Sequence, residues 1–281
     1  MCKDCGCSQP SEPNHALHTH DHAHDHGQAH SHHHHDHGDG SAAHDHPPHA
    51  TKGRKLSVER SLLEANDHQA WHNREHFRTS GVFALNLMSS PGAGKTRLLE
   101  RTLDDLGSKL KMAVVVGDLQ TDNDARRLQD RGAPVIPITT GTMCHLEAGM
   151  VHKACHQLDL HSLDVLFIEN VGNLVCPASF DLGEASRVVL MSVTEGEDKP
   201  FKYPPMFKLA DAVLLTKTDM AEAADFNIEL AAGNIRNVAP QAELFQLSAR
   251  TRDGLEAWYE FILRGVAEQK HTTAAHHATT H

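Results

Sequence analysis

The stretch Ser89-Ser90-Pro91-Gly92-Ala93-Gly94-Lys95-Thr96 decides the fold of this 281-residue chain. It follows the apolar run 82–88 (VFALNLM), which is typical of a buried strand, and it leads into 95–107, which we interpret as a helix. A glycine-rich turn between a strand and a helix is the setting of a P-loop, because the backbone N–H groups of the loop and the amino end of the helix surround a phosphate. The pattern therefore predicts a nucleotide-binding site.

Each residue type in this loop has an expected task. Gly92 and Gly94 let the backbone approach the phosphates, Lys95 is expected to reach the β- and γ-phosphates, and Thr96 is expected to bind Mg²⁺. The loop departs from the usual pattern at one position, since Ser89 stands where the first glycine is expected. A chance glycine-rich turn is the alternative, and the flanking strand and helix disfavour it.

Outward from the loop, short apolar runs alternate with helical patterns. Continuous apolar runs separated by helices indicate a parallel sheet covered on both faces, so the predicted fold class is α/β, a P-loop NTPase. Ligands of such sheets bind at the carboxyl ends of the strands. The expected strands are 82–88, 112–117, 135–139, 165–171, 187–193, 212–217 and 243–249, and the expected helices are 95–107, 123–131, 147–158, 225–238 and 253–265.

Acidic residues at two strand ends are expected to join the phosphate site. Glu169 precedes Gly172 by three residues, which resembles the acidic-x-x-Gly element that senses a γ-phosphate. Asp118 is a candidate for binding Mg²⁺ or orienting the attacking water, in competition with Asp122 and Asp124. Asp122 fits the alternative role of a helix N-cap equally well. The predicted catalytic residues are Lys95, Asp118 and Glu169.

Two further elements indicate a guanine site. Thr216-Lys217-Thr218-Asp219 resembles the N-K-x-D element with threonine in first place, and Leu247-Ser248-Ala249 resembles the S-A-x element behind the base. The carboxylate of Asp219 can accept from both N1–H and N2–H₂ of guanine, whereas adenine offers no matching pair of donors. The sequence thus predicts GTP, bound by Lys217, Asp219, Ser248 and Ala249. Three arginines near these loops, Arg126, Arg127 and Arg250, are equal candidates for a catalytic arginine finger.

The overall composition excludes several classes of protein. The formal net charge of −11 argues against a nucleic-acid binder, because such proteins carry a basic surface. No apolar run reaches about 18 residues, so no membrane span is expected, and a secretory signal pattern is lacking. We therefore expect a cytoplasmic location, where the six cysteines are more typical of ligands or free thiols than of disulfides.

The amino terminus is rich in potential metal ligands. Cys2, Cys5 and Cys7 are close enough in sequence to bind one ion, and thiolates suit Ni²⁺ as well as Zn²⁺. Residues 14–50 contain fifteen histidines, a composition typical of a disordered metal-binding tract. The alternatives are a cysteine-rich end without a ligand and, for the four histidines at 32–35, an expression tag.

A second set of soft ligands lies inside the α/β region. Cys144 and His145 follow a strand and open a helix, and with Cys176 they would form a metal site. Cys176 lies seven residues beyond Glu169, so a conformational change on hydrolysis would reach the metal. Cys155, among apolar neighbours, is interpreted as a core residue.

Three histidines, His68, His72 and His76, recur every four residues and therefore share one helix face. We interpret them as a polar outer face, with a further metal-binding stripe as the alternative.

Composition divides the chain into three parts. Residues 1–55 form a Cys- and His-rich tail that we expect to be disordered, because it is too polar to form a core. Residues 56–268 form the P-loop domain, which opens with a loosely amphipathic helix over about 57–78. Residues 269–281 are again polar, and we expect them to be disordered.

The set of motifs resembles the HypB family, GTPases that insert nickel into [NiFe]-hydrogenase. The matching stretches span nearly the whole chain, and the pair CHLEAG and NLVCP is quite specific. They are the CxxCGC terminus, the His-rich tract, SSPGAGKT, GTMCHLEAG, ENVGNLVCPASFDLGE and TKTD.

The resemblance implies a GTP-dependent homodimer that delivers nickel to the hydrogenase large-subunit precursor, together with a small zinc-containing partner of the HypA type. It implies a high-affinity nickel site and a second nickel or zinc site at the dimer interface. The residues are Cys2, Cys5 and Cys7 for the first site, and Cys144, His145 and Cys176 for the second.

Two other functions remain compatible with these residues. A nickel store would use the histidines of 14–50 and would bind several ions per chain. A urease accessory GTPase shares the fold and the metal, but its motif at the metal is Cys-Pro-His, whereas here Cys144-His145 and Cys176-Pro177 are separate.

Overall fold

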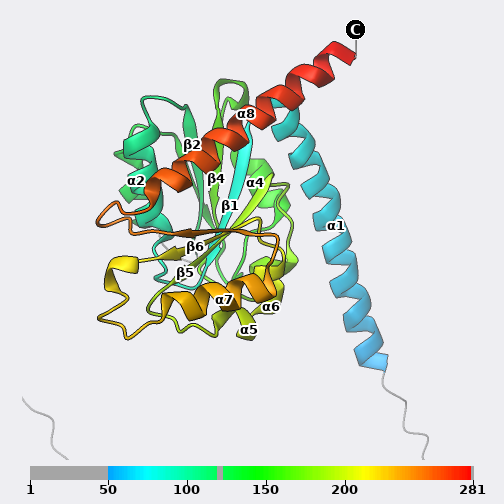
Figure 1. Ribbon diagram of the computed structural model, residues 1–281. Helices are drawn as coiled ribbons and strands as arrows, with labels where there is room; N and C mark the ends of the chain where they lie inside the picture. The colour runs from blue at the N-terminus through cyan, green and yellow to red at the C-terminus, as the bar shows by residue number, and fades with distance from the viewer. Residues whose placement is uncertain (1–49, 119–122, 280–281) are drawn as a thin grey trace, which may run out of the picture. The chain divides into compact units, whose positions relative to one another are not determined.

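The structure, a computed structural model, describes the backbone of residues 50–118 and 123–279 and the side chains of 60–118 and 124–275. In this described part, one parallel sheet has the strand order β3-β2-β4-β1-β5-β6-β7, with β1 between β4 and β5 (Figure 1). The strands are β1 (Phe83–Ser89), β2 (Met112–Asp118), β3 (Val135–Thr139), β4 (Val165–Glu169), β5 (Ser186–Ser192), β6 (Ala212–Thr216) and β7 (Glu243–Gln246). The predicted α/β class is confirmed.

Helices cover both faces of the sheet, and α-helices connect successive strands except between β4 and β5, where a 3₁₀ turn lies. The α-helices are α1 (Ala50–Ser80), α2 (Lys95–Leu106), α3 (Asn123–Gln129), α4 (Ala148–Cys155), α5 (Lys199–Lys202), α6 (Pro204–Lys208), α7 (Ile228–Val238) and α8 (Leu255–Thr279). Single 3₁₀ turns are η1 (Leu160–Ser162), η2 (Cys176–Ser179) and η3 (Thr218–Met220). None of the helices in the described residues is long and apolar enough to cross a membrane.

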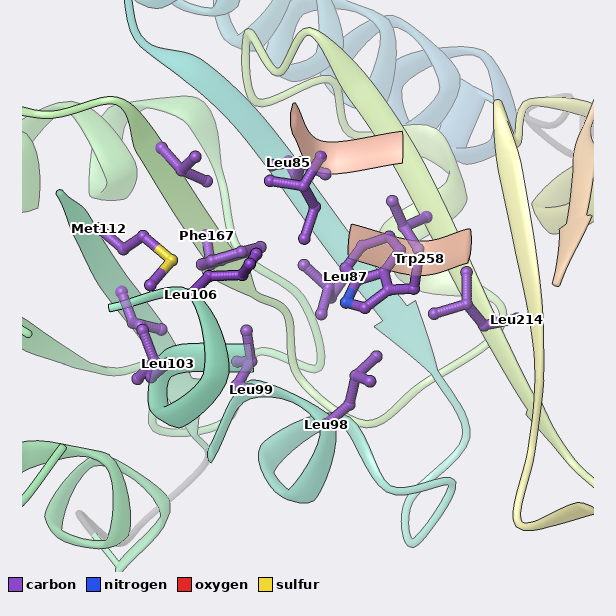
Figure 2. Close-up of a cluster of buried hydrophobic side chains, with 14 of the residues drawn as sticks. Leu85, Leu87, Leu98, Leu99, Leu103, Leu106, Met112, Phe167, Leu214 and Trp258 are labelled. Atoms are coloured by element: carbon purple, nitrogen blue, oxygen red, sulfur yellow. The ribbon is translucent and has the colours of Figure 1, made fainter. Parts of the chain in front are cut away.

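One face of the sheet is covered by α2, α3 and α8. Alternate strand residues such as Leu85, Leu87 and Phe167 lie in one buried cluster with Trp258 of α8 (Figure 2). Trp258 is fully buried, and its indole N–H donates to Thr102 Oγ1 at 3.0 Å, so burial of the ring leaves no unpaired donor. Each such apolar side chain contributes roughly 1.5–3 kcal/mol of transfer free energy, and this cluster fixes α2 beside the P-loop.

The other face carries two separate clusters. Residues of β2 and β4 pack against α1 and α4, while residues of β5 and β6 pack against α6 and α7. Strand side chains alternate between the two faces, so continuous apolar runs are buried on both sides, as the sequence pattern predicts. Cys155 is buried in the α1/α4 cluster, which confirms its interpretation as a core residue.

The first helix is longer than predicted. It was expected from about residue 57 to 78, but α1 begins at Ala50, so residues 50–55, which we assigned to a disordered tail, are helical. The segment TKGRKL contains mostly good helix formers, which carry the helix toward its amino end. Residues 1–49 lie outside the described part, and the predictions for them are not tested.

The prediction of a disordered carboxyl-terminal tail at 269–281 is wrong over most of its length, because α8 continues to Thr279. Two contacts hold this last part against the domain. Lys270 pairs with Asp164 at the amino end of β4, and Thr273 Oγ1 donates to the Arg78 carbonyl oxygen at 2.7 Å. The polar composition of the tail gave no sign of these tertiary partners.

Candidate functional site

The P-loop joins the carboxyl end of β1 to the amino end of α2. Gly92 and Gly94 have φ values of +76° and +99°, a backbone conformation that other residues rarely adopt. Ser89, at the position of the expected first glycine, accepts a hydrogen bond of 2.8 Å from the Lys95 ammonium through its Oγ. The serine therefore supplies a partner for a buried lysine that a glycine would lack.

Two buried charges face each other across the loop. Burial lowers the pKa of Lys95, and the carboxylates around it, Glu169 first, oppose that shift. Burial raises the pKa of Glu169 to about 7, although the Lys95 ammonium opposes the shift. Glu169 Oε1 accepts from Thr96 Oγ1 at 2.7 Å, and its buried Oε2 has no partner among the described side chains. The site therefore concentrates oxygen ligands beside a cation.

A pocket of about 430 Å³ opens over these residues. Lys95, Thr96, Asp118 and Glu169 line it, so the predicted catalytic and Mg²⁺-binding residues come together. Asp118 ends β2 and Asp124 lies in α3, and both line the pocket, whereas Asp122 lies outside the described residues. The volume is typical of a small-molecule site. A larger cavity of about 630 Å³ lies at the amino ends of the strands beside Met112 and Leu163, far from the P-loop, and we exclude it as the nucleotide site.

A second pocket of about 340 Å³ adjoins the first, and both are lined by Gly94 and Arg97. Its walls come from the ends of β6 and β7 and contain the predicted guanine-binding residues, Lys217, Asp219, Ser248 and Ala249. Thr216 Oγ1 donates to the Ala93 carbonyl at 2.7 Å. The threonine that replaces the usual asparagine thus ties β6 to the P-loop.

Asp219 is held by two residues in this pocket. Its Oδ1 accepts from Ser248 Oγ at 2.5 Å, and its Oδ2 accepts from Arg250 Nε and Nη2 at 2.7 and 2.6 Å. These hydrogen bonds, that from Ser248 first, lower the pKa of Asp219 and keep it ionised. Arg250 presents two neighbouring N–H groups to the carboxylate, which is the donor pattern of N1–H and N2–H₂ of guanine.

The second predicted metal site also assembles. Cys144, His145 and Cys176 each offer a ligand atom within 4.8 Å of the others, and no other set of three converges so closely among the described His, Cys, Asp and Glu side chains. The two Sγ atoms are 2.7 Å apart, and both cysteines are free. Two soft sulfurs and one imidazole in contact suit a thiophilic divalent ion.

The His145 ring is fixed before any ion binds. It stacks on Phe180 with ring centroids 3.8 Å apart, and burial lowers the pKa of the imidazole, which favours the neutral form that binds metals. Its Nε2 is buried without a hydrogen-bond partner among the described residues, and Glu147 Oε1 is 3.8 Å away. An unpartnered ring nitrogen beside two thiols fits a ligand role.

A residue that sequence reasoning missed connects the two sites. Asn170 follows Glu169, and its Oδ1 accepts from Leu146 N at 3.1 Å, two residues beyond Cys144. Leu146 also covers the end of β2, since a Cβ on Gly117 would lie 2.8 Å from its side chain. The metal-binding loop therefore touches the strand ends that carry Asp118 and Glu169.

Asn170 belongs to a buried polar chain that the sequence only hinted at. Its Nδ2 donates to Asn86 Oδ1 at 3.2 Å, and Asn86 Nδ2 donates to Glu184 Oε1 at 3.2 Å. The available signal was an asparagine in the middle of the apolar strand 82–88, because a buried amide needs partners.

The first predicted metal site is not tested by the structure, because Cys2, Cys5 and Cys7 lie outside the described residues.

Comparison with known proteins agrees with this geometry. Residues 83–246 match the family model described as "CobW/HypB/UreG, nucleotide-binding domain". The chain is 51% identical to hydrogenase maturation factor HypB of Rhizobium leguminosarum bv. viciae, over 77% of this chain and 73% of that protein. It is 49% identical to HypB of Azotobacter vinelandii, over 79% and 73%.

A solved HypB structure has a similar fold. HypB from Helicobacter pylori, crystallised in complex with nickel, superposes with a TM-score of 0.70 at 43% identity, covering 73% of this chain and 97% of that one. A P-loop beside a two-cysteine, one-histidine site, in a chain this similar, identifies the family. The chain belongs to the HypB hydrogenase maturation factors, within the CobW/HypB/UreG family of nucleotide-binding proteins.

Proposed function

We propose that the chain is a GTP-hydrolysing nickel metallochaperone that delivers Ni²⁺ to the large-subunit precursor of a [NiFe]-hydrogenase. The observation that carries the proposal is the hydrogen bond between Asn170 Oδ1 and Leu146 N. Asn170 follows Glu169 of the phosphate pocket, and Leu146 follows His145 of the metal site. A movement of Glu169 that depends on the nucleotide would therefore move the metal-binding loop.

In this proposal the phosphate pocket performs the hydrolysis. Lys95 and the loop amides bind the phosphates, and Asp118 or Glu169 orients the attacking water. The hydroxyl of Thr96, with Asp118 beside it in the pocket, provides the oxygen ligands that Mg²⁺ prefers. Mg²⁺ bound there would supply charge neutralisation at the β- and γ-phosphates.

The adjoining pocket supports GTP as the nucleotide. The side chain of Asp219 is 7% exposed and ionised, and Ser248 holds one of its oxygens. Arg250 donates to the other oxygen, where guanine can replace it with a matching pair of N–H donors. Adenine offers no such pair. Lys217 and Ala249 line the walls on either side.

Nickel is the proposed cargo of the Cys144, His145 and Cys176 site, because a similar HypB was solved with nickel and because this ligand set suits Ni²⁺ as well as Zn²⁺. Three protein ligands leave a coordination position open through which an ion can be passed on. We further propose a GTP-promoted homodimer with this site at its interface, and transfer together with a zinc-containing partner of the HypA type.

In this proposal the amino-terminal residues bind and store nickel. Cys2, Cys5 and Cys7 form a high-affinity nickel site, and the fifteen histidines of 14–50 store nickel in the cytoplasm. Storage predicts several Ni²⁺ ions per chain in equilibrium dialysis and a loss of most of them when residues 14–50 are deleted.

The central test is whether GTP changes the affinity of the metal site. In a Cys2→Ala/Cys5→Ala/Cys7→Ala form of the full chain, thiolate-to-nickel absorption reports Cys144 and Cys176, because Cys155 is buried. We expect GTP with Mg²⁺ to change the Ni²⁺ dissociation constant by about 5- to 150-fold, the usual range for coupled sites. ATP with Mg²⁺ should have no such effect.

Two variants control this measurement. Adding Cys144→Ala and Cys176→Ala should abolish the absorption, and Asn170→Ala should diminish the effect of GTP. If the titrations with and without GTP superimpose, the nucleotide and metal sites are not coupled, and a nickel store with an independent nucleotide hydrolase is the better account. If ATP acts as GTP does, the assignment of guanine fails.

A further inference from the structure

A second group of potential metal ligands lies between α1 and α4, among residues that line neither nucleotide pocket. His152, in the last turn of α4, and His156, which caps that helix, are one turn apart. Their Nε2 atoms are 3.1 Å apart, and their rings meet at 79° with centroids 4.5 Å apart. His152 is half-buried and His156 is exposed, so solvent ions can reach the pair.

Histidines of α1 and η1 face this pair. α1 packs along α4 (Figure 1), and it carries His72 and His76 one turn apart. Burial, followed by repulsion from His156 and His161, lowers the pKa of His76. The same causes lower the pKa of His152, where the repelling groups are His156, His76 and His72. These mutual repulsions place the imidazoles in one neighbourhood, and they favour the neutral rings that bind metals.

The separation of the two nitrogens fits a shared ion. Metal–imidazole bonds measure about 2.0–2.1 Å, so nitrogens 3.1 Å apart subtend about 95–102° at a common ion. That angle lies between the angle of square-planar or octahedral coordination and that of tetrahedral coordination. A hydrogen bond between the two rings also fits this distance, but it does not involve the neighbouring imidazoles of α1 and η1.

We propose that His152 and His156 bind a divalent transition-metal ion of the nickel or zinc class, with His76 as a third ligand after rotation of its side chain. The all-imidazole set has no thiolate, in contrast to Cys144, His145 and Cys176, so it is suited to an ion that exchanges readily. α1 follows the histidine-rich residues 14–50 in sequence, and α4 begins four residues after Cys144. The site exists whether or not the cysteine site carries nickel.

Trp71 provides a local reporter for this site in the full chain. It lies edge-on to His72 with centroids 4.9 Å apart and is 55% exposed, whereas the second tryptophan, Trp258, is buried on the opposite face of the sheet. Titration with NiCl₂ should quench the emission of Trp71 saturably, and excess Zn²⁺ should restore it by displacement. The variant His152→Ala/His156→Ala should raise the midpoint of quenching at least tenfold.

Matched variants separate this site from others. His156→Gln, at an exposed position, should also raise the midpoint, which distinguishes loss of a ligand from a folding defect. His271→Ala, at an exposed histidine of α8, and Cys144→Ala/Cys176→Ala should leave it unchanged. Trp71→Phe should remove the signal. No saturable quenching in the unchanged chain, or an unchanged midpoint in His152→Ala/His156→Ala, would overturn the proposal. Loss of quenching in Cys144→Ala/Cys176→Ala would place the ion at the cysteine site and would also overturn the proposal.

Discussion

Ser89 and Thr216 stand where related motifs use glycine and asparagine, and each makes a contact with the P-loop. The Ser89 hydroxyl accepts from the Lys95 ammonium, and the Thr216 hydroxyl donates to the Ala93 carbonyl. Motif matching treats both residues as departures from a pattern. In the structure each satisfies a buried polar group, which is a reason for a side chain to be present at both positions.

Arg250 occupies the position on Asp219 that guanine is expected to take, so its removal should strengthen nucleotide binding. It pairs with Asp219 Oδ2, where guanine is expected to donate, and its side chain is 72% exposed. Guanine must break this ion pair to reach Asp219, and an exposed ion pair contributes about 0.2–1 kcal/mol. Arg250→Ala removes that cost and should therefore tighten GDP binding by about 1.4- to 5-fold. Calorimetric titration with GDP measures this change.

Arg252→Ala is the matched control for that variant. Arg252 pairs with Asp105, outside the base pocket, and its loss should leave GDP affinity unchanged. Weaker GDP binding by Arg250→Ala would show that the guanidinium contacts the bound nucleotide rather than competing with it.

At the scale of elements, polar contacts help the apolar core to hold the two long terminal helices. Asn73 of α1 donates to the carbonyls of Ala148 and Leu182 at 2.9 and 3.0 Å, and Asn66 accepts from Ala148 N at 2.9 Å. The amino end of α4, just after the metal-binding loop, is thus fixed by side chains of α1. Such contacts have no periodic signature in the sequence, so the role of α1 was not predicted.

The end of α8 should depend on its two polar contacts. We expect Lys270→Ala/Thr273→Val to increase hydrogen exchange of the amides at 274–279, because the variant removes the contacts to Asp164 and to the Arg78 carbonyl. Overall stability should fall by only about 0.5–2 kcal/mol, as expected for one exposed ion pair and one hydrogen bond.

Thr272→Val is the control for the helix end, because among the described residues Thr272 Oγ1 donates to Glu268 O within α8 and to no residue outside that helix. Equal exchange in both variants and the unchanged chain would mean that α8 persists by its own helix propensity, and that its contacts with the domain are incidental.

Across the whole molecule, the buried chain of Asn170, Asn86 and Glu184 links strands β4, β1 and the loop before β5. Burial raises the pKa of Glu184, and Arg187, which donates to Oε1 at 2.7 Å, opposes that shift. The network therefore joins the carboxyl end of β4, through the middle of β1, to the loop that precedes β5.

Asn86→Ala should lower the free energy of unfolding by about 1–3 kcal/mol, because it leaves buried polar partners unsatisfied. Urea denaturation measures this loss. Asn173→Ala removes local contacts with Val175 N and with the Cys176 thiol, and it should change stability by less than about 0.5 kcal/mol. A similar small loss at Asn86 would mean that water replaces the amide and that the network is not a structural link.

The sequence by itself determined the parallel α/β sheet and the P-loop, and it singled out the residues that line the two pockets at the strand ends. This information is local, because periodicity and short motifs at strand ends depend on neighbours in the chain. The convergence of Cys144 with Cys176, the pairing of Asp219 with Arg250 and the histidines shared by α1 and α4 were decided only by the tertiary structure. Those contacts join residues brought together by packing of the sheet, and no local pattern encodes the distance between them.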